Sequence, residues 1–408
     1  MPKPTVVIVG AGLAGATCAT ALRERGYDGR IMLLGAESHR PYIRPPLSKE
    51  FLKGDAPLED AFVHPEQWYA DNSVELVPET TAGSFDPGAH ELFLAGGARI
   101  TFDSLVIATG ASARRLDVPG SGHGAVYTLR TIEDSERLRG ALEAGGRRVV
   151  VVGSGWIGLE VAAAARGYGN DVTVVGTAAV PLFSALGPEL GGVFERLHRE
   201  NGVDFRNGAS VVAIDGADDG PREVVTGTGE RIPADLVVVG VGAAPNTLVA
   251  QRSRLALDNG VPVDQGMRTA AEDVYAIGDV ANPFLPAIGR RLRNEHWANA
   301  IAGGTVAARS ILGEDASYDD IPYFYTDQYD LGMEYSGYAP LARDARIVYR
   351  GDVDAREFVA FWLREDRVVA GMNVNVWDVN EQVQRLIRSD APIDAERLAD
   401  PSVDLAAL

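Results

Sequence analysis

The chain contains a single cysteine, Cys18, among its 408 residues. One thiol excludes an internal disulfide framework, a cysteine-based zinc site, a Cys-ligated iron–sulfur cluster and a redox-active dithiol. The six histidines show no paired spacing that would suit a metal, so we predict no metal site. If the protein carries out redox chemistry, its electrons must reside on something other than sulfur. Cys18 falls on an expected helix, where a small buried apolar residue is expected.

Positive charge and long apolar runs are also scarce. Lys and Arg number 38 against 57 Asp and Glu, and the net charge of −19 repels nucleic-acid phosphates. No uncharged apolar run approaches the roughly 18 residues that a membrane span needs. The N-terminus superficially fits a signal peptide, but its glycines suit an apolar targeting segment badly. We therefore expect a cytoplasmic protein that binds neither nucleic acid nor membrane.

Glycine, by contrast, is abundant, with 46 residues, and its placement is informative. Residues 6–9 form a β-branched run, typical of a strand buried in a parallel sheet, and are followed by Gly-Ala-Gly-Leu-Ala-Gly at 10–15 and an Ala-rich helical stretch. A second strand at 30–34 ends near Glu37. This is a dinucleotide fingerprint in its required context, since the glycines allow close backbone approach, the helix start binds pyrophosphate and the acid binds ribose. The alternative is a glycine-rich turn without a ligand.

The same pattern occurs a second time: an apolar strand at 148–152, a glycine-rich segment at 153–160 and a second strand at 171–175. Two fingerprints predict two dinucleotides, of which one would be a resident flavin and the other a nicotinamide dinucleotide that donates electrons. The alternative is a duplicated second site that has lost its ligand. Apolar strands ending in small residues at 104–110 and 235–242 argue against that alternative, because they read as chain crossings between two domains beside a ligand.

The residue pattern changes after about residue 325, where the dinucleotide-binding motifs end. Its apolar patterns predict antiparallel strands joined in part by a turn at Glu365–Asp366, and then helices. The expected strands are 345–350, 357–364 and 367–374, and the expected helices are 379–388 and 394–398.

The chain resembles the two-dinucleotide flavoprotein reductases, and within them the bacterial ferredoxin reductases of the putidaredoxin-reductase and biphenyl-dioxygenase-reductase type. The motifs that carry the resemblance span almost the whole chain and are the segments at 10–15, 44–49, 107–110, 129–131, 153–160, 275–279, 295–297 and 327–329. The resemblance implies an α/β fold with two Rossmann-like dinucleotide-binding domains and a small C-terminal α+β domain. Its implied boundaries are 1–112 with 243–324 for the FAD-binding domain, 113–242 for the NAD(P)H-binding domain and 325–408 for the C-terminal domain.

The resemblance also implies the residues that bind the two dinucleotides. For FAD they are Gly10, Gly12, Leu13, Ala14, Gly15, Glu37, Arg44, Lys49, Ala82, Ala108, Thr109, Gly110, Arg130, Gly278, Asp279, Glu295, His296 and Trp297. For the nicotinamide coenzyme they are Gly153, Gly155, Trp156, Ile157, Gly158, Glu160, Gly176, Val241 and Gly242. Several have a plain alternative, because Arg44 and Arg130 could be surface charges and Trp297 could be core.

Lys49 and Glu160 are the implied catalytic residues, because relatives bring the two together near the flavin N5. An ammonium there favours negative charge on the reduced ring, and the carboxylate fixes the position of the lysine. The alternative is an ordinary ion pair between two parts of the fold. A Lys49→Met change tests the catalytic interpretation.

The coenzyme site departs from its relatives at Gly176, where they usually have Glu. Both the acid that repels a 2′-phosphate and the cation that attracts one are missing before Glu189. We expect NADH as the coenzyme, with NADPH possible, and weak coenzyme binding.

Electrons must leave the flavin for another protein, because the chain has no cysteine pair and no metal cluster of its own. The resemblance implies a flavoprotein that accepts a hydride from NADH on FAD and passes single electrons to an iron–sulfur ferredoxin serving a monooxygenase or dioxygenase. Such ferredoxins are acidic, so we expect a basic docking face, and the best candidate is a loop with Arg290, Arg291 and Arg293. An ordinary solvated loop is the alternative.

Two other functions stay open at this point. The first is a flavin-dependent reductase that acts directly on a quinone or an ascorbate radical. The second is a signalling flavoprotein similar to apoptosis-inducing factor, although the chain shows no long targeting or basic segment.

Overall fold

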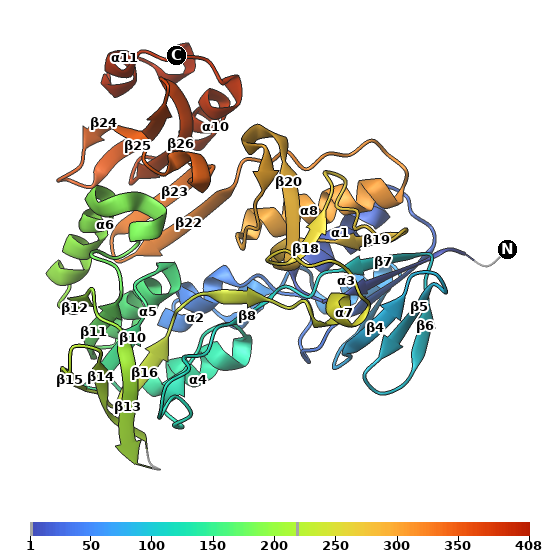
Figure 1. The fold of residues 1–408 in the computed structure, drawn as a ribbon, viewed down its shortest axis with the longest axis horizontal. Coiled ribbons are helices and arrows are strands. Elements are labelled where there is room, and N and C mark those ends of the chain that lie inside the picture. The colour runs from blue at the N-terminus through green and yellow to red at the C-terminus, as the bar shows by residue number, and fades with distance from the viewer. Residues whose placement is uncertain (1–2, 218–219) are drawn as a thin grey trace. The chain divides into compact units, whose positions relative to one another are not determined.

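The computed structural model describes residues 3–217 and 220–408 (Figure 1). Residues 1–2 of the predicted FAD-binding domain and residues 218–219 of the predicted NAD(P)H-binding domain lie outside the described residues. The chain forms two compact units. Unit 1 comprises the chain up to Ile43 together with residues 58–112 and 244–323, and unit 2 comprises residues 44–57, 113–243 and 324–408.

Unit 1 is built on a parallel five-stranded sheet with the strand order β19-β7-β1-β2-β3. The strands are β1 (Thr5–Val9), β2 (Arg30–Leu34), β3 (Val74–Val77), β7 (Ser104–Ile107) and β19 (Val274–Ala276). Residues 6–9 of β1 are at most 5% exposed, as expected for a strand covered on both faces. Helices α1 (Leu13–Glu24) and α8 (Trp297–Ile311) lie side by side (Figure 1). They approach so closely that a Cβ at Gly304 would lie 2.7 Å from the Ala14 carbonyl oxygen.

Unit 1 also contains shorter elements. They are the sheet β4 (Ala82–Asp86), β5 (Glu91–Leu94) and β6 (Arg99–Thr101), the sheet β18 (Val261–Val263), β20 (Ala281–Leu285) and β21 (Arg290–Arg291), and helices α3 (Glu66–Asp71) and α7 (Leu248–Arg252).

Unit 2 repeats the parallel sheet with the order β12-β11-β10-β16-β9. Its strands and helices are β9 (Val126–Tyr127), α4 (Ile132–Leu142), β10 (Arg148–Val152), α5 (Trp156–Gly167), β11 (Asp171–Gly176), α6 (Phe183–Glu200), β12 (Val203–Asn207) and β16 (Leu236–Val239). A smaller antiparallel sheet consists of β13 (Val211–Ala217), β14 (Gly220–Thr226) and β15 (Arg231–Pro233).

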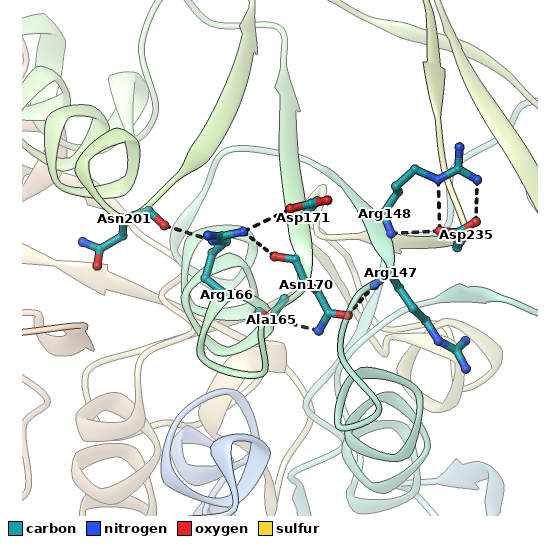
Figure 2. Close-up of polar contacts among 8 residues, drawn as sticks. All are labelled: Arg147, Arg148, Ala165, Arg166, Asn170, Asp171, Asn201 and Asp235. Atoms are coloured by element: carbon teal, nitrogen blue, oxygen red, sulfur yellow. Dashed lines mark hydrogen bonds and ion pairs between the residues drawn. The ribbon is translucent and has the colours of Figure 1, made fainter.

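Polar side chains fasten the amino ends of the unit 2 strands (Figure 2). The buried Asn170 side chain accepts from the Arg147 amide at 3.1 Å and donates to the carbonyl oxygens of Leu142 and Ala165 at 2.9 and 3.0 Å. Arg148 and Asp235 form a bidentate pair that holds the pKa of the Asp235 carboxyl at about 2. With the amino ends held in this way, the opposite edge of the sheet can carry a ligand site.

The last part of unit 2 is an antiparallel sheet with helices. Its elements are β22 (Tyr323–Gln328), β23 (Leu331–Gly337), α9 (Ala339–Ala342), β24 (Arg346–Asp352), β25 (Glu357–Arg364), β26 (Arg367–Val374), α10 (Asn380–Ser389) and α11 (Ala395–Ala399). The predicted strands, helices and turn are confirmed, since Glu365 and Asp366 take φ values of 50° and 57° between β25 and β26. The α/β fold class is also confirmed, whereas the domain boundaries stay a prediction.

Within residues 3–217 and 220–408, the helices fall short of the length and apolarity that a membrane span requires. The same residues hold no group of three side chains suited to a metal ion.

Candidate functional site: two dinucleotide turns and a buried ion pair

The turn between β1 and α1 in unit 1 is shaped to admit a phosphate. Gly10 has φ +122°, and a Cβ there would lie 2.1 Å from the Ala108 carbonyl oxygen, so only glycine fits. Gly12, at the start of α1, has no atom within 4 Å of the position of an added Cβ, and no side chain caps the helix. Uncapped amides at a helix start beside open space fit the pyrophosphate of a dinucleotide.

A carboxylate lies at the position beside this turn that is predicted to bind the ribose. Glu37 follows β2, and a Cβ at neighbouring Gly35 would lie 2.9 Å from the Cβ of Ala11 in the turn. The buried Tyr42 hydroxyl donates to Glu37 Oε2 at 2.5 Å, so the acid is held in place. Tyr42 could not have been identified from the sequence, because no local pattern ties it to the acid.

Three other predicted residues of unit 1 lie at the ends of strands and helices. Gly278 begins a short 3-10 helix after β19, and a Cβ there would lie 2.9 Å from Ala14 Cβ. Thr109 follows β7, and its hydroxyl donates to the Asn246 carbonyl oxygen at 2.7 Å. Trp297 begins α8 and is 38% exposed, so the plain core interpretation of this residue is wrong.

The turn between β10 and α5 in unit 2 has the same geometry. Gly153 has φ +111°, a Cβ there would lie 2.3 Å from the Gly240 carbonyl oxygen, and Gly155 again faces open space. The predicted coenzyme residues Ile157 and Val241 are 43% and 37% exposed beside this turn. The Trp156 ring instead packs on Phe194 and Phe324, at 5.6 and 4.9 Å between ring centroids.

At the carboxyl end of β11, the side chain of Ser154 fills the space beside Gly176. A Cβ on Gly176 would lie 2.4 Å from Ser154 Oγ and 2.9 Å from Ser154 Cβ. The first charged residue beyond this point, Glu189, accepts a hydrogen bond from the Tyr349 hydroxyl at 2.8 Å. Residues 176–188, from the end of β11 onward, therefore contain no charged side chain.

Lys49 and Glu160 form a buried ion pair in unit 2. Lys49 Nζ lies 2.8 Å from Glu160 Oε1, and the two residues are 4% and 3% exposed. Glu160 also accepts from Ser48 Oγ at 2.5 Å and from Thr326 Oγ1 at 2.6 Å. A buried ion pair is stable only when further hydrogen bonds satisfy its atoms, and these two hydroxyls supply them. Ser48 and Thr326 were missed by sequence reasoning.

Two more predicted FAD residues, Arg44 and Arg130, lie in unit 2 and contact each other. The Arg44 guanidinium donates to the Arg130 carbonyl oxygen. The Arg130 amide donates to Asp134 Oδ2 at 3.0 Å, next to the capping box at Thr131 that begins α4. Their proposed role toward FAD stays a prediction.

The arginines expected on a docking loop are arranged differently. Arg290 and Arg291 form strand β21, which pairs with β20, so the expectation of a loop is wrong here. Arg291 Nη1 donates to the carbonyl oxygens of Val263 and Asn282 at 2.6 and 2.7 Å. Arg293, with a side chain only 10% exposed, donates to Glu295 at 2.6 Å. Only Arg290 of the three is exposed to solvent.

The lone thiol fits the structural role expected for it. Cys18 is fully buried on α1, and burial raises the pKa of its thiol to about 12. A thiol of that kind is unreactive at neutral pH.

Two families match the chain. Residues 4–304 match the family described as pyridine nucleotide-disulphide oxidoreductase, and residues 323–408 match the family described as reductase C-terminal.

Named relatives match along almost their whole length. The chain is 40% identical over 406 residues to the anthranilate 1,2-dioxygenase system ferredoxin–NAD(+) reductase component of Burkholderia cepacia, covering 99% of both chains. It is 35% identical over 405 residues to putidaredoxin reductase CamA of Pseudomonas putida, covering 98% of this chain and 95% of the relative. A crystal structure of the covalent putidaredoxin reductase–putidaredoxin complex matches with a TM-score of 0.95 and 34% identity, covering 100% of this chain and 98% of the matched chain.

Proposed function

The chain belongs to the pyridine nucleotide-disulphide oxidoreductase family, and from that premise we propose that it is a flavoprotein that passes electrons from NADH to an iron–sulfur ferredoxin. The observation that carries the proposal is the pair of matching phosphate turns in a chain whose only thiol is buried and unreactive. Because no disulfide can form within the chain, the electrons must pass to a separate acceptor. Relatives are named as ferredoxin–NAD(+) reductases, which supports a ferredoxin as that acceptor.

The two turns would hold different dinucleotides. The turn at Gly10–Gly15 with its fixed Glu37 would hold FAD, and the turn at Gly153–Gly158 would admit the coenzyme. When bound, FAD accepts two electrons from a nicotinamide and releases them singly. The overall reaction balances as NADH plus two oxidised ferredoxins giving NAD⁺, H⁺ and two reduced ferredoxins.

Lys49 is the residue we propose to act on the reacting end of the flavin. Its ammonium would favour the negative charge that builds up there, and Glu160 would hold the ammonium in place. Ser48 and Thr326 keep Glu160 in its acceptor role, because each donates a hydroxyl proton to one of its oxygens.

For the coenzyme, we propose NADH over NADPH. A 2′-phosphate needs a cation, and residues 176–188 contain no charged side chain. Ser154 beside Gly176 offers the ribose hydroxyls a neutral hydrogen-bonding group instead. Comparing kcat/KM for the two coenzymes tests this choice, and a strong preference for NADPH would refute it.

For ferredoxin docking, we propose a contribution from Arg290 alone among the three arginines. Arg291 and Arg293 make contacts within unit 1, whereas Arg290 is an exposed residue. An exposed cation mainly accelerates the encounter with an acidic partner.

Anaerobic stopped-flow mixing tests the proposed function as a whole. The holoprotein is first reduced with NADH and then mixed with an oxidised iron–sulfur ferredoxin or, separately, with a quinone. We expect rapid reduction of about two ferredoxins per NADH, as the electron count requires. Turnover with the quinone and none with any ferredoxin would overturn the proposal in favour of a small-molecule reductase.

A further inference from the structure

A line of buried polar side chains runs from Glu160 to the last turn of α6 in unit 2. Thr326 and Gln328 lie two residues apart on β22, so both side chains are on the same face of the strand. His198 on α6 is next to Gln328, and all three are at most 1% exposed. Glu160, at the inner end of the line, is 3% exposed.

The contacts along this line are continuous. His198 Nε2 lies 2.7 Å from Gln328 Oε1, and Gln328 Nε2 lies 3.1 Å from Thr326 Oγ1. Thr326 Oγ1 lies 2.6 Å from Glu160 Oε1, the same oxygen that receives Lys49 Nζ at 2.8 Å.

The hydrogen bonds along this line all have their donors on the side of His198 and their acceptors on the side of Glu160. An amide oxygen only accepts, so His198 must carry its proton on Nε2 and donate it to Gln328. This contact orients the Gln328 amide so that its NH₂ group faces Thr326. Because Thr326 Oγ1 accepts from Gln328, its single hydroxyl proton is directed at Glu160.

We propose that His198 is a positioning residue for the Lys49–Glu160 pair, acting through Gln328 and Thr326 as a one-way donor relay. His198 orients the amide, the amide orients the hydroxyl, and the hydroxyl holds the carboxylate that receives Lys49. Donors aligned in one direction polarise one another, so each strengthens the next and the carboxylate is held more firmly than by Thr326 alone.

The surroundings of His198 keep it in the state that the relay requires. Burial lowers the pKa of the imidazole to about 4, so the ring is neutral at neutral pH and has one N–H. Its other nitrogen, Nδ1, faces the Tyr329 hydroxyl at 3.4 Å, and a hydroxyl can donate to it. Phe205 covers another side of the ring in an edge-on contact.

The relay rests on the proposed role of Lys49 and Glu160 in flavin reduction, and the variants are chosen to separate the two. His198→Met removes the donor at similar length, whereas His198→Gln retains an N–H near the position of Nε2. Gln328→Glu reverses the relay, because a carboxylate accepts from both neighbours and draws the Thr326 proton away from Glu160. Arg199→Gln is the matched control, since Arg199 is adjacent in sequence and pairs with Glu195.

The first readout is independent of turnover. Histidine-selective nitrogen NMR of the holoprotein at neutral pH identifies the His198 signal as the one lost in His198→Gln. We expect the Nε2–H tautomer, and we expect the signal to shift in Thr326→Val but not in Arg199→Gln. An Nδ1–H tautomer, or no response to Thr326→Val, would overturn the relay.

The second readout is the rate of flavin reduction at saturating NADH. We expect His198→Met and Gln328→Glu to slow it about tenfold with the NADH affinity unchanged, and His198→Gln to stay near the wild-type rate. If His198→Met does not fold, Gln328→Glu decides the question. Wild-type rates in both, with Lys49→Met slow, would refute the relay alone, whereas a wild-type rate in Lys49→Met would refute the role of the pair and the relay with it.

Discussion

The two glycine turns are nearly identical in backbone geometry and differ in what stands beside them. Gly10 and Gly153 have φ values of +122° and +111°, and both are closed in by a backbone oxygen of a neighbouring strand end. Gly12 and Gly155 both begin a helix with no side-chain cap and face open space. The two turns therefore share the backbone geometry that suits a phosphate.

The ribose ends are different. The first turn has Glu37, which the buried Tyr42 hydroxyl holds at 2.5 Å. The second has Gly176, where Ser154 occupies the space that a larger residue would need. A fixed carboxylate can accept from ribose hydroxyls, whereas beside Gly176 the neighbouring polar group is the neutral Ser154 hydroxyl. We therefore expect the two turns to differ in how they hold a ribose and not in how they hold a phosphate.

Replacing Lys49 should have the largest effect on electron transfer. The two turns are alike, so they cannot by themselves account for the transfer of electrons from one dinucleotide to the other. Replacing Lys49 with Met removes the ammonium that we place at the flavin, so NADH-dependent flavin reduction should slow about 100-fold. Anaerobic stopped-flow absorbance measures the rate, and the FAD content should be unchanged. Lys53→Met is the matched control in the same unit, and an equal loss there would contradict the assignment.

A tenfold change in NADH affinity is expected when a carboxylate is added beside the second turn, as Glu37 stands beside the first. Gly176→Asp alone places a Cβ against Ser154, whereas Ser154→Gly/Gly176→Asp removes that clash and adds the carboxylate. The double variant should bind NADH about tenfold more tightly and discriminate more strongly against NADPH. Equilibrium binding of each coenzyme to both variants measures this. Equal NADH affinity in the single and double variants would show that Ser154 does not control the site.

The smallest effect is expected on the rate of ferredoxin reduction when Arg290 is changed. Arg290→Glu should slow ferredoxin reduction about threefold and weaken its dependence on salt, because an exposed cation acts on the encounter rate. Ferricyanide reduction should be unaffected, and Arg252→Glu supplies the same charge change elsewhere in unit 1. Equal slowing with both acceptors would exclude a role in docking.

Much of this fold could be predicted from local sequence. Parallel strands buried on both faces read as continuous apolar runs, so the sequence predicts residues 30–34 and 148–152 at their observed limits. The strands at 357–364 and 367–374 were also predicted at their observed bounds, since a turn separates two apolar runs.

The contacts made between distant segments could not be predicted. Thr326 lies 166 residues from Glu160, and no periodicity connects a hydroxyl on one strand to a carboxylate on a remote helix. Likewise, a run of arginines has the same appearance whether a residue is exposed, as Arg290 is, or donates to carbonyl oxygens, as Arg291 does. Side-chain hydrogen bonds of this kind depend on the completed tertiary structure.

The central claim is that the first turn holds FAD and the second holds the nicotinamide coenzyme. Its most direct test replaces one glycine of each turn with alanine. Gly12→Ala and Gly155→Ala change positions with ordinary φ values and no protein atom within 4 Å, so only a bound ligand would meet the new Cβ. The FAD content and the NADH affinity are measured in both purified variants. We predict that Gly12→Ala loses FAD at least tenfold more readily, while Gly155→Ala keeps its FAD and binds NADH about tenfold more weakly. Loss of FAD from Gly155→Ala, with FAD retained in Gly12→Ala, would contradict the assignment of the two turns.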